Sequence, residues 1–315
     1  DIVSIENLLE AWKEFIRGKR NKKDVQKLSL NLMDNVISLH SDLFNNTYKH
    51  GGYQAFNISD PKPRNIHKAS VRDRLLHHAV YRKLYPFFEW TFISDSFSCR
   101  LRKETHKAIV RFRKFGCIAS KNNTRTCWIL KCDIRKFFAN INHKVLIGIL
   151  REYIPDKNII RLLENVIKSF SVGLPLGNLT SQLFVNIYMN KFDQFVKHKL
   201  KAKHYIHYAD DFVIFSEDRE WLEKQIASIK DFLTSELKLE LHPKKVSIKT
   251  LCSGVDFLGW INFADHRVLR TATKRRMMRR IEECPATPTI NSYLGLLRHG
   301  NARKLETRLL NGIGA

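Results

Sequence analysis

Residues 204–216, HYIHYADDFVIFS, place two adjacent acidic residues inside an otherwise apolar stretch. The runs on either side of Asp210 and Asp211 are rich in aromatic and β-branched residues, which predicts two strands joined by an acidic turn. Two carboxylates in apolar surroundings are costly unless a positive charge neutralises them. Side chains alternate along a strand, so both acids serve one site only if a turn separates them. A solvated acidic hairpin turn is the alternative.

A third acidic residue ends an apolar run upstream. Residues 127–133, CWILKCD, predict a buried strand with Asp133 at its end, although a helix cap is the alternative for this residue alone. Together with Asp210 and Asp211, it would supply the hard oxygen ligands that select Mg²⁺ or Mn²⁺. Such a set suits two ions roughly 3.5 to 4 Å apart, which is the arrangement of two-metal phosphoryl transfer.

The segments around these acids predict an α+β fold. Apolar spacing predicts four helices and a second hairpin: helices at 143–153, 157–170, from 179 onward and at 218–238, with the hairpin near 254–262. Upstream, residues 1–50 read as helical, 51–66 as strands and turns, and 72–90 as a helix. This order favours an antiparallel sheet backed by helices on one face.

The charge of the chain favours a polyanionic partner. Lysine and arginine total 55 against 31 acidic residues, a net charge of +24, in a chain of 315 residues. A merely basic protein without such a partner is the alternative. The basic residues are spread along the chain, and no apolar run reaches the roughly 18 to 20 residues of a membrane span, so a membrane partner is not expected.

The cysteines and the first residues bear on the cellular compartment. The six cysteines form no CxxC pair, so they read as reduced thiols and favour a cytoplasmic location. The opening DIVSIENLLEAWKEF is amphipathic rather than a signal peptide. Residue 1 is not Met, so we expect the native N-terminus to be missing or processed.

The motifs, taken in order, resemble those of reverse transcriptases. YADDF (208–212) follows KCDIRKFF (131–138), and the resemblance extends from about Lys62 to Trp260. The other matching segments are DPKPRNI (60–66), RDR (72–74), SFSCRLRKETHKA (96–108), GLPLGNLTSQLFVNIYMNKFD (173–193), LHPKK (241–245) and FLGW (257–260). The resemblance implies an RNA-directed DNA polymerase whose partners are template RNA, a cDNA or primer strand and dNTPs.

The same resemblance implies a right-hand polymerase with fingers, palm and a short helical thumb. Residues 1–125 would form N-terminal helices and fingers, with further fingers elements near 143–172. Residues 126–262 would form the palm, an antiparallel sheet backed by helices, with the catalytic motifs and the primer grip. Residues 263–315 would form the basic thumb.

The resemblance also assigns the catalytic residues. Asp133, Asp210 and Asp211 would hold two Mg²⁺ ions, with the backbone carbonyl of Ile134 as an extra ligand. Lys245 would be the general acid that protonates the leaving pyrophosphate, which a lysine can do if its pKa falls toward the working pH. A solvated basic turn is the alternative for Lys245.

Matching positions imply a nucleotide site and a primer–template surface. Lys62 and Arg64 would grip the triphosphate, unless they are solvated charges in a loop. Phe138 would exclude ribonucleotides by lying under the sugar, unless it is a packing residue, and Leu176 and Gly177 would form the pocket floor. Template and primer would be contacted by Arg74, Gln182, Tyr208, Phe257, Leu258, Gly259, Trp260, Lys274 and Arg275. A salt bridge to Asp73 is the alternative role for Arg74, and a solvated face is the alternative for TKRRMMRR (273–280).

The loop at 176–182 narrows the resemblance. Most reverse transcriptases carry QGxxxSP here, whereas this chain reads LGNLTSQ. This form resembles the enzymes of diversity-generating retroelements, which copy a template RNA with errors at adenine and work with a small basic helical accessory protein. Leu176 in place of Gln removes a polar contact, which should relax discrimination. The alternatives are a phage-defence reverse transcriptase and a non-enzymatic RNA-binding protein.

Overall fold

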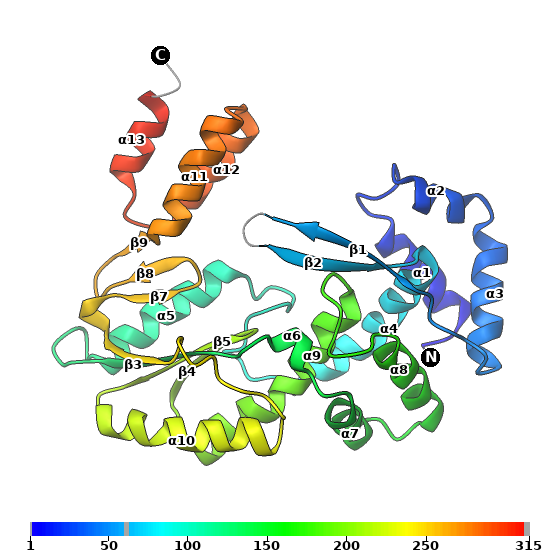
Figure 1. Cartoon of the computed structure of the whole chain (residues 1–315), viewed down its shortest axis with the longest axis horizontal. Coiled ribbons are helices and arrows are strands. Elements are labelled where there is room, and N and C mark those ends of the chain that lie inside the picture. Colours follow the sequence, from blue (N-terminus) through cyan, green and yellow to red (C-terminus); the bar gives the residue numbers. More distant parts are fainter. Residues whose placement is uncertain (1, 60–62, 312–315) are drawn as a thin grey trace. The chain divides into compact units, whose positions relative to one another are not determined.

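The acidic turn lies at one end of a four-stranded antiparallel sheet. The computed structural model describes residues 2–59 and 63–311 (Figure 1). The sheet has the order β4-β5-β3-β6, and its strands are β3 (Trp128–Asp133), β4 (His204–Tyr208), β5 (Asp211–Ser216) and β6 (Ser247–Thr250). The predicted strand ending at Asp133 and the predicted hairpin at 204–216 are confirmed.

Both faces of this sheet are covered. Phe212, Val213, Ile214 and Phe215 are all at most 3% exposed, and consecutive strand residues point to opposite faces. The sheet is therefore buried on both of its faces, whereas the sequence pattern indicated a cover of helices on one face. One face packs against α5 (Thr105–Ala119), where the rings of Phe112 and Phe215 meet edge to face with centroids 4.8 Å apart.

Contacts between residues divide the chain into two compact units, each built from three segments. Unit 1 contains residues 1–94, 134–195 and 230–240, and unit 2 contains residues 95–133, 196–229 and 241–315. Residues 95–125, which the predicted division places with the fingers, lie in unit 2 because α5 packs on the sheet. The three-part division stays a prediction.

Unit 1 is mainly helical. Several of its helices begin at side chains that accept backbone N–H groups, such as Ser4, Ser70 and Asn142. Its elements are α1 (Ile5–Phe15), α2 (Lys23–Leu30), α3 (Leu32–Phe44), β1 (Tyr53–Ile58), β2 (Arg64–Ala69), α4 (Val71–Glu89), α6 (Phe137–Asn140), α7 (His143–Tyr153), α8 (Lys157–Lys168) and α9 (Leu179–Gln194). The strands β1 and β2 form a hairpin that is exposed over most of its length. A π-helical turn (Phe195–Lys199) follows α9.

Unit 2 adds a small sheet and a helical C-terminal segment. Strands β7 (Val255–Phe257), β8 (Trp260–Asn262) and β9 (Arg267–Leu269) are antiparallel. The two residues between β7 and β8 are Leu258 and Gly259, with φ of 50° and 87°, the left-handed conformations that a tight hairpin requires. This confirms the predicted hairpin near 254–262.

The C-terminal helices pack around one apolar cluster. They are α11 (Thr271–Glu283), α12 (Thr287–Leu297) and α13 (Arg303–Asn311), preceded in the chain by a short 3₁₀ turn (Leu251–Ser253) and by α10 (Arg219–Ser235). Met277 is fully buried against Trp260 and Leu297, whereas Lys274 and Arg275 are exposed. The TKRRMMRR segment is thus a helix with one packed side, as expected. Among the described helices, none is long and apolar enough to cross a membrane.

Candidate active site

The fold brings the three predicted carboxylates to one end of the sheet. Asp133 and Asp211 lie directly opposite each other in the β3–β5 register. Tyr208 pairs with Asp211 across β4 and β5, so Ala209 and Asp210 form a two-residue turn. Ala209 adopts a left-handed φ of 55°, which is uncommon for a residue with a side chain. The turn places Asp210 beside Asp211 at the same edge, as two acids serving one site require.

Two lysines partly neutralise these acids. The Nζ atom of Lys245 lies 2.8 Å from Oδ2 of Asp133, and the Nζ atom of Lys131 lies 3.9 Å from Oδ1 of Asp211. That Oδ1 atom is buried and accepts no hydrogen bond. Burial raises the pKa of Asp211 to about 6, with the nearby charges of Asp210 and Asp133 adding to the effect and Lys131 opposing it.

The donor set fits a divalent cation in kind. A buried carboxylate oxygen that accepts no hydrogen bond, next to two further acids, is an environment that a hard cation would stabilise. In the described part of the chain, however, no three Asp, Glu, His or Cys side chains converge closely enough to enclose an ion. The ammonium group of Lys245 pairs with the carboxylate of Asp133 in place of a metal cation. Because this lysine is 47% exposed, its flexible side chain can move away from Asp133.

Lys131 is a site residue that sequence reasoning missed. It lies two residues before Asp133 on β3, so strand alternation puts both side chains on the same face. The two-residue spacing in the sequence could therefore have predicted that Lys131 lies beside the acids. A second contact unforeseen from sequence links Tyr208 to Thr105, whose hydroxyl groups lie 2.8 Å apart.

The described residues among those predicted for the nucleotide site lie in unit 1. The backbone N–H of His67 on β2 donates to the carbonyl of Leu176 at 3.0 Å. Gly177 has φ of 106°, and a Cβ there would lie 2.7 Å from Cγ2 of Ile66, so only glycine lets the loop and β2 approach this closely. The predicted floor of the pocket therefore docks on the strand that carries Arg64.

Other predicted residues in unit 1 fall around this junction. A cavity of about 380 Å³ is lined by Arg74, Gly177 and Gln182, among others. Phe138 is half-buried, and its carbonyl accepts the N–H of Leu174 at 2.8 Å, next to the same loop. The remaining three are Arg64, which is exposed, Ile134, which is buried, and Lys62, which lies outside the described residues.

Arg74 forms an ion pair, but not with its neighbour in the sequence. Its guanidinium donates to Oδ2 of Asp24 at 2.7 Å, so its partner is not Asp73, which was the alternative to a template contact. Asp73 is buried and instead accepts hydrogen bonds from Tyr48, Gly51 and Ser70. The Nε atom of Arg74 is buried and has no hydrogen-bond partner. The side chain thus keeps one donor unused.

The predicted primer-grip hairpin is only partly accessible. Phe257 is 0% exposed and Trp260 is 2% exposed, so their side chains belong to the core. Leu258 and Gly259 at the turn are half-buried. Any primer contact from this hairpin would therefore come from its two turn residues.

Comparison with known proteins identifies the family. Residues 56–262 match the family described as reverse transcriptase (RNA-dependent DNA polymerase). The chain belongs to the reverse transcriptase family. It is therefore an enzyme of the RNA-directed DNA polymerase class.

Individual proteins are also similar to this chain, at modest sequence identity. Protein YkfC of Escherichia coli K12 is 26% identical over 274 residues, which cover 72% of this chain and 68% of that protein. The group II intron-encoded protein LtrA of Lactococcus lactis is 25% identical over 291 residues, covering 68% and 46%. The chain thus spans about two thirds and about half of these two relatives.

Solved structures support the fold. A telomerase from Candida albicans, in complex with a fragment of telomeric RNA, superposes with a TM-score of 0.52 at 12% identity, covering 71% of this chain and 46% of that one. A telomerase from Candida tropicalis gives a TM-score of 0.50 at 12% identity, covering 71% and 54%. The right-hand polymerase fold expected from the sequence is confirmed.

Proposed function

We propose that this chain copies an RNA template into cDNA, with Asp133, Asp210 and Asp211 as its metal-binding carboxylates. The observation that carries the proposal is the direct pairing of Asp133 with Asp211, beside a turn that adds Asp210. The buried Oδ1 atom of Asp211 supports it, because this atom accepts no hydrogen bond and a divalent cation would bind it as a ligand. Two Mg²⁺ ions, or Mn²⁺, would lower the pKa of the primer 3′-hydroxyl and neutralise charge on the triphosphate.

The remaining roles follow from the chain's own side chains. Lys245 lies within hydrogen-bonding distance of Asp133, so its ammonium group is close enough to the acids to protonate pyrophosphate as it leaves. The backbone carbonyl of Ile134 completes the proposed ligand set. Lys62 and Arg64 bind the triphosphate, and Phe138, Leu176 and Gly177 shape the pocket around the sugar and base.

The surfaces for nucleic acid form the rest of the proposal. Arg74 and Gln182 line the same cavity of about 380 Å³, which suits a template contact. Tyr208, the turn of the 257–260 hairpin, and the exposed Lys274 and Arg275 contact the primer–template duplex. Fingers, palm and thumb follow the division at residues 125 and 262, and the six cysteines, none of which forms a disulfide, fit a cytoplasmic location.

The LGNLTSQ loop supports a narrower role. We infer that the enzyme is the error-prone reverse transcriptase of a diversity-generating retroelement, working with a small basic helical accessory protein. Its support is Leu176, which offers the pocket only apolar contact where a Gln would offer hydrogen bonds.

The catalytic assignment is tested by primer extension with Asp210→Asn. The substitution removes a ligand charge but leaves the basic surfaces, so extension should fall to background while RNA binding stays within about twofold. Asp231→Asn, an exposed residue on α10, is the matched control and should extend normally. Extension by the Asp210 variant within about tenfold of the unmodified enzyme would remove these acids from the mechanism.

A further inference from the structure

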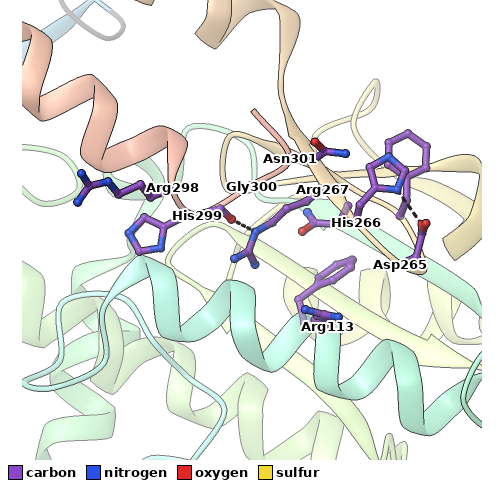
Figure 2. A pocket seen from close by; sticks show the side chains of 11 residues that line it. Arg113, Asp265, His266, Arg267, Arg298, His299, Gly300 and Asn301 are labelled. Carbon is purple, nitrogen blue, oxygen red and sulfur yellow. Dashed lines mark hydrogen bonds and ion pairs between the residues drawn. The ribbon is translucent and has the colours of Figure 1, made fainter. Parts of the chain in front are cut away.

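A cationic cavity lies in unit 2, and none of the predicted site residues lines it. It has a volume of about 280 Å³ and opens between α5, the β8–β9 turn and the link from α12 to α13 (Figure 2). The lining side chains that matter here are Asn262, His266, Arg113, Arg267, Arg298 and His299.

The positive charge in this cavity is poorly balanced. Within the described residues, the exposed guanidinium groups of Arg113 and Arg298 have neither an ion pair nor a hydrogen bond. The pKa of Arg267 is lowered by burial and by the nearby charge of Arg113. Asp265 is the one acidic residue among those that line the cavity, and its Oδ1 atom lies 2.7 Å from Nδ1 of His266. A bound anion would relieve the repulsion between Arg113 and Arg267.

The walls of the cavity are held in place without a ligand. The guanidinium of Arg267 donates to the carbonyl of His299, and the N–H of Asn301 donates back to the carbonyl of Arg267 at 2.8 Å. The ring of His299 stacks on His106 with centroids 3.6 Å apart. These contacts fix Arg267 and His299 in the cavity wall, which lowers the entropic cost of holding a ligand there.

The cavity is also tied to the predicted primer-grip hairpin. A Cβ at Gly300 would lie 2.1 Å from the indole of Trp260, so the α12–α13 link packs directly on that ring. The guanidinium of Arg267 lies 5.7 Å from the centre of the same ring. Filling the cavity would therefore brace the link against the hairpin.

We propose that this cavity binds a phosphate group of a nucleic-acid strand. Arginine forks match the geometry of phosphate oxygens, and an open cavity of this size accommodates a phosphate that remains part of a strand. The net charge of +24 makes polyanions the ligands that would collect at the surface. The inference rests on the proposed function only in that it takes RNA as the partner.

The test compares two pairs of substitutions with equal change in charge. Arg113→Gln with Arg298→Gln alters the cavity, whereas Lys114→Gln with Lys304→Gln alters exposed residues that do not line it. Binding of fluorescent single-stranded RNA to the full chain is followed by anisotropy at several salt concentrations. The cavity pair should weaken binding roughly tenfold and make the log K against log[salt] slope shallower by about 1, and the control pair should do neither. Arg113→Lys with Arg298→Lys should restore only part of the affinity, because lysine keeps the charge without the planar fork.

A second arm separates a strand phosphate from free phosphate. Calorimetric titration with inorganic phosphate is carried out on the unmodified chain and on the cavity pair. If the cavity pair loses phosphate binding but keeps full RNA affinity, the ligand is free phosphate and the proposal is wrong. Equal losses of RNA affinity in the cavity pair and the control pair would mean that only the overall charge matters, and this result would also overturn the proposal. Absence of RNA binding in the unmodified chain would overturn the proposed function as well, whereas the other outcomes leave that function standing.

Discussion

At the scale of single residues, the acids of the site depend on lysines that come from separate strands and loops. Lys131 faces Asp211 from the neighbouring strand, and Lys245 reaches Asp133 from a loop 112 residues further along the chain. Both contacts lessen the repulsion among three acids at one sheet edge. Because Lys245 is half exposed, it can release Asp133 without disturbing the core, whereas the 16% exposed Lys131 stays in place.

Leu176 carries the prediction about copying errors. Its backbone is anchored by His67, so a change of side chain leaves the loop in position. A polar check in a binding pocket is worth roughly 1 to 3 kcal/mol, or about ten- to hundredfold in discrimination. We expect frequent misincorporation opposite template adenine, and a several-fold lower error rate in Leu176→Gln.

Sequencing cDNA made by both enzymes on one RNA template measures this effect. Extension of correct pairs should stay within an order of magnitude, because the acids and the triphosphate grip are unchanged. Leu174→Met, a volume-conserving change in the same loop, controls for loop packing. Identical error spectra for Leu176→Gln and the unmodified enzyme would make Leu176 a packing residue only.

His77 makes the stability of the fold depend on pH. It is 1% exposed, and burial lowers its pKa to about 3, with the neighbouring His50 adding to the effect. In the unfolded chain its pKa is about 6.5. Below about pH 6.5 the unfolded state binds a proton at this histidine, whereas the native state does not bind it until about pH 3. The free energy of unfolding therefore decreases as the pH is lowered from about 6.5 to about 3.

The expected loss from His77 alone is about 2 kcal/mol at about pH 5 relative to neutral pH. Urea unfolding at the two pH values, in the unmodified chain and in His77→Gln, measures it as the difference between the two shifts. His198→Gln, an exposed histidine, is the control. If His77→Gln loses as much stability on acidification as the unmodified chain, His77 does not govern this response.

At the scale of elements, two glycines should respond oppositely to the same substitution. Gly148 is exposed in the middle of α7, and a Cβ there would meet nothing within 4 Å. Gly148→Ala should stabilise the protein by about 0.5 to 1 kcal/mol, because alanine is less flexible in the unfolded state. Gly177→Ala should destabilise it by about 1 to 3 kcal/mol, since it combines a positive φ with a 2.7 Å approach to Ile66.

Chemical denaturation of the two variants measures both effects, and each serves as the other's control. Gly177→Ala should in addition raise the dNTP concentration needed for half-maximal extension, because it separates the loop from β2. Equal stability of the two variants would mean that the loop tolerates a Cβ.

Elements with strong local signals could be predicted from the sequence. The helix expected at 143–153 is α7 with the same bounds, because Asn142 caps its first turn, and the helix expected at 157–170 is α8. Strands β6 and β9 were missed because runs of three or four residues show too little alternation to detect. The helix α5 was not predicted, although its buried residues Ala108, Phe112, Phe115 and Ala119 recur at helical spacing.

In the candidate site, too, some features could be predicted from the sequence and others could not. Asp133, Asp210 and Asp211 stand at the ends of apolar runs, so their convergence followed from the pattern of strands. The partner of Arg74 is 50 residues away and that of Lys245 is 112 residues away. Such pairs are set by tertiary packing, which a local pattern does not contain.

At the scale of the whole molecule, the net charge of +24 acts on folding and on binding with opposite signs. Self-repulsion destabilises the compact chain, and added salt screens it. The same salt weakens RNA binding, because each phosphate contact releases counterions, with a slope of about −0.7 per contact for a single strand. Raising NaCl through the physiological range should therefore raise the melting temperature of the free chain while lowering its affinity for RNA.

Calorimetry and fluorescence anisotropy in matched buffers measure the two responses, and potassium glutamate in place of chloride controls for anion competition. A salt slope near zero for RNA would mean that the excess charge does not contact phosphates. A melting temperature that falls with salt would mean instead that the surface cations are stabilised by ion pairs such as Lys68–Asp24 and Arg72–Asp42 rather than repelling one another.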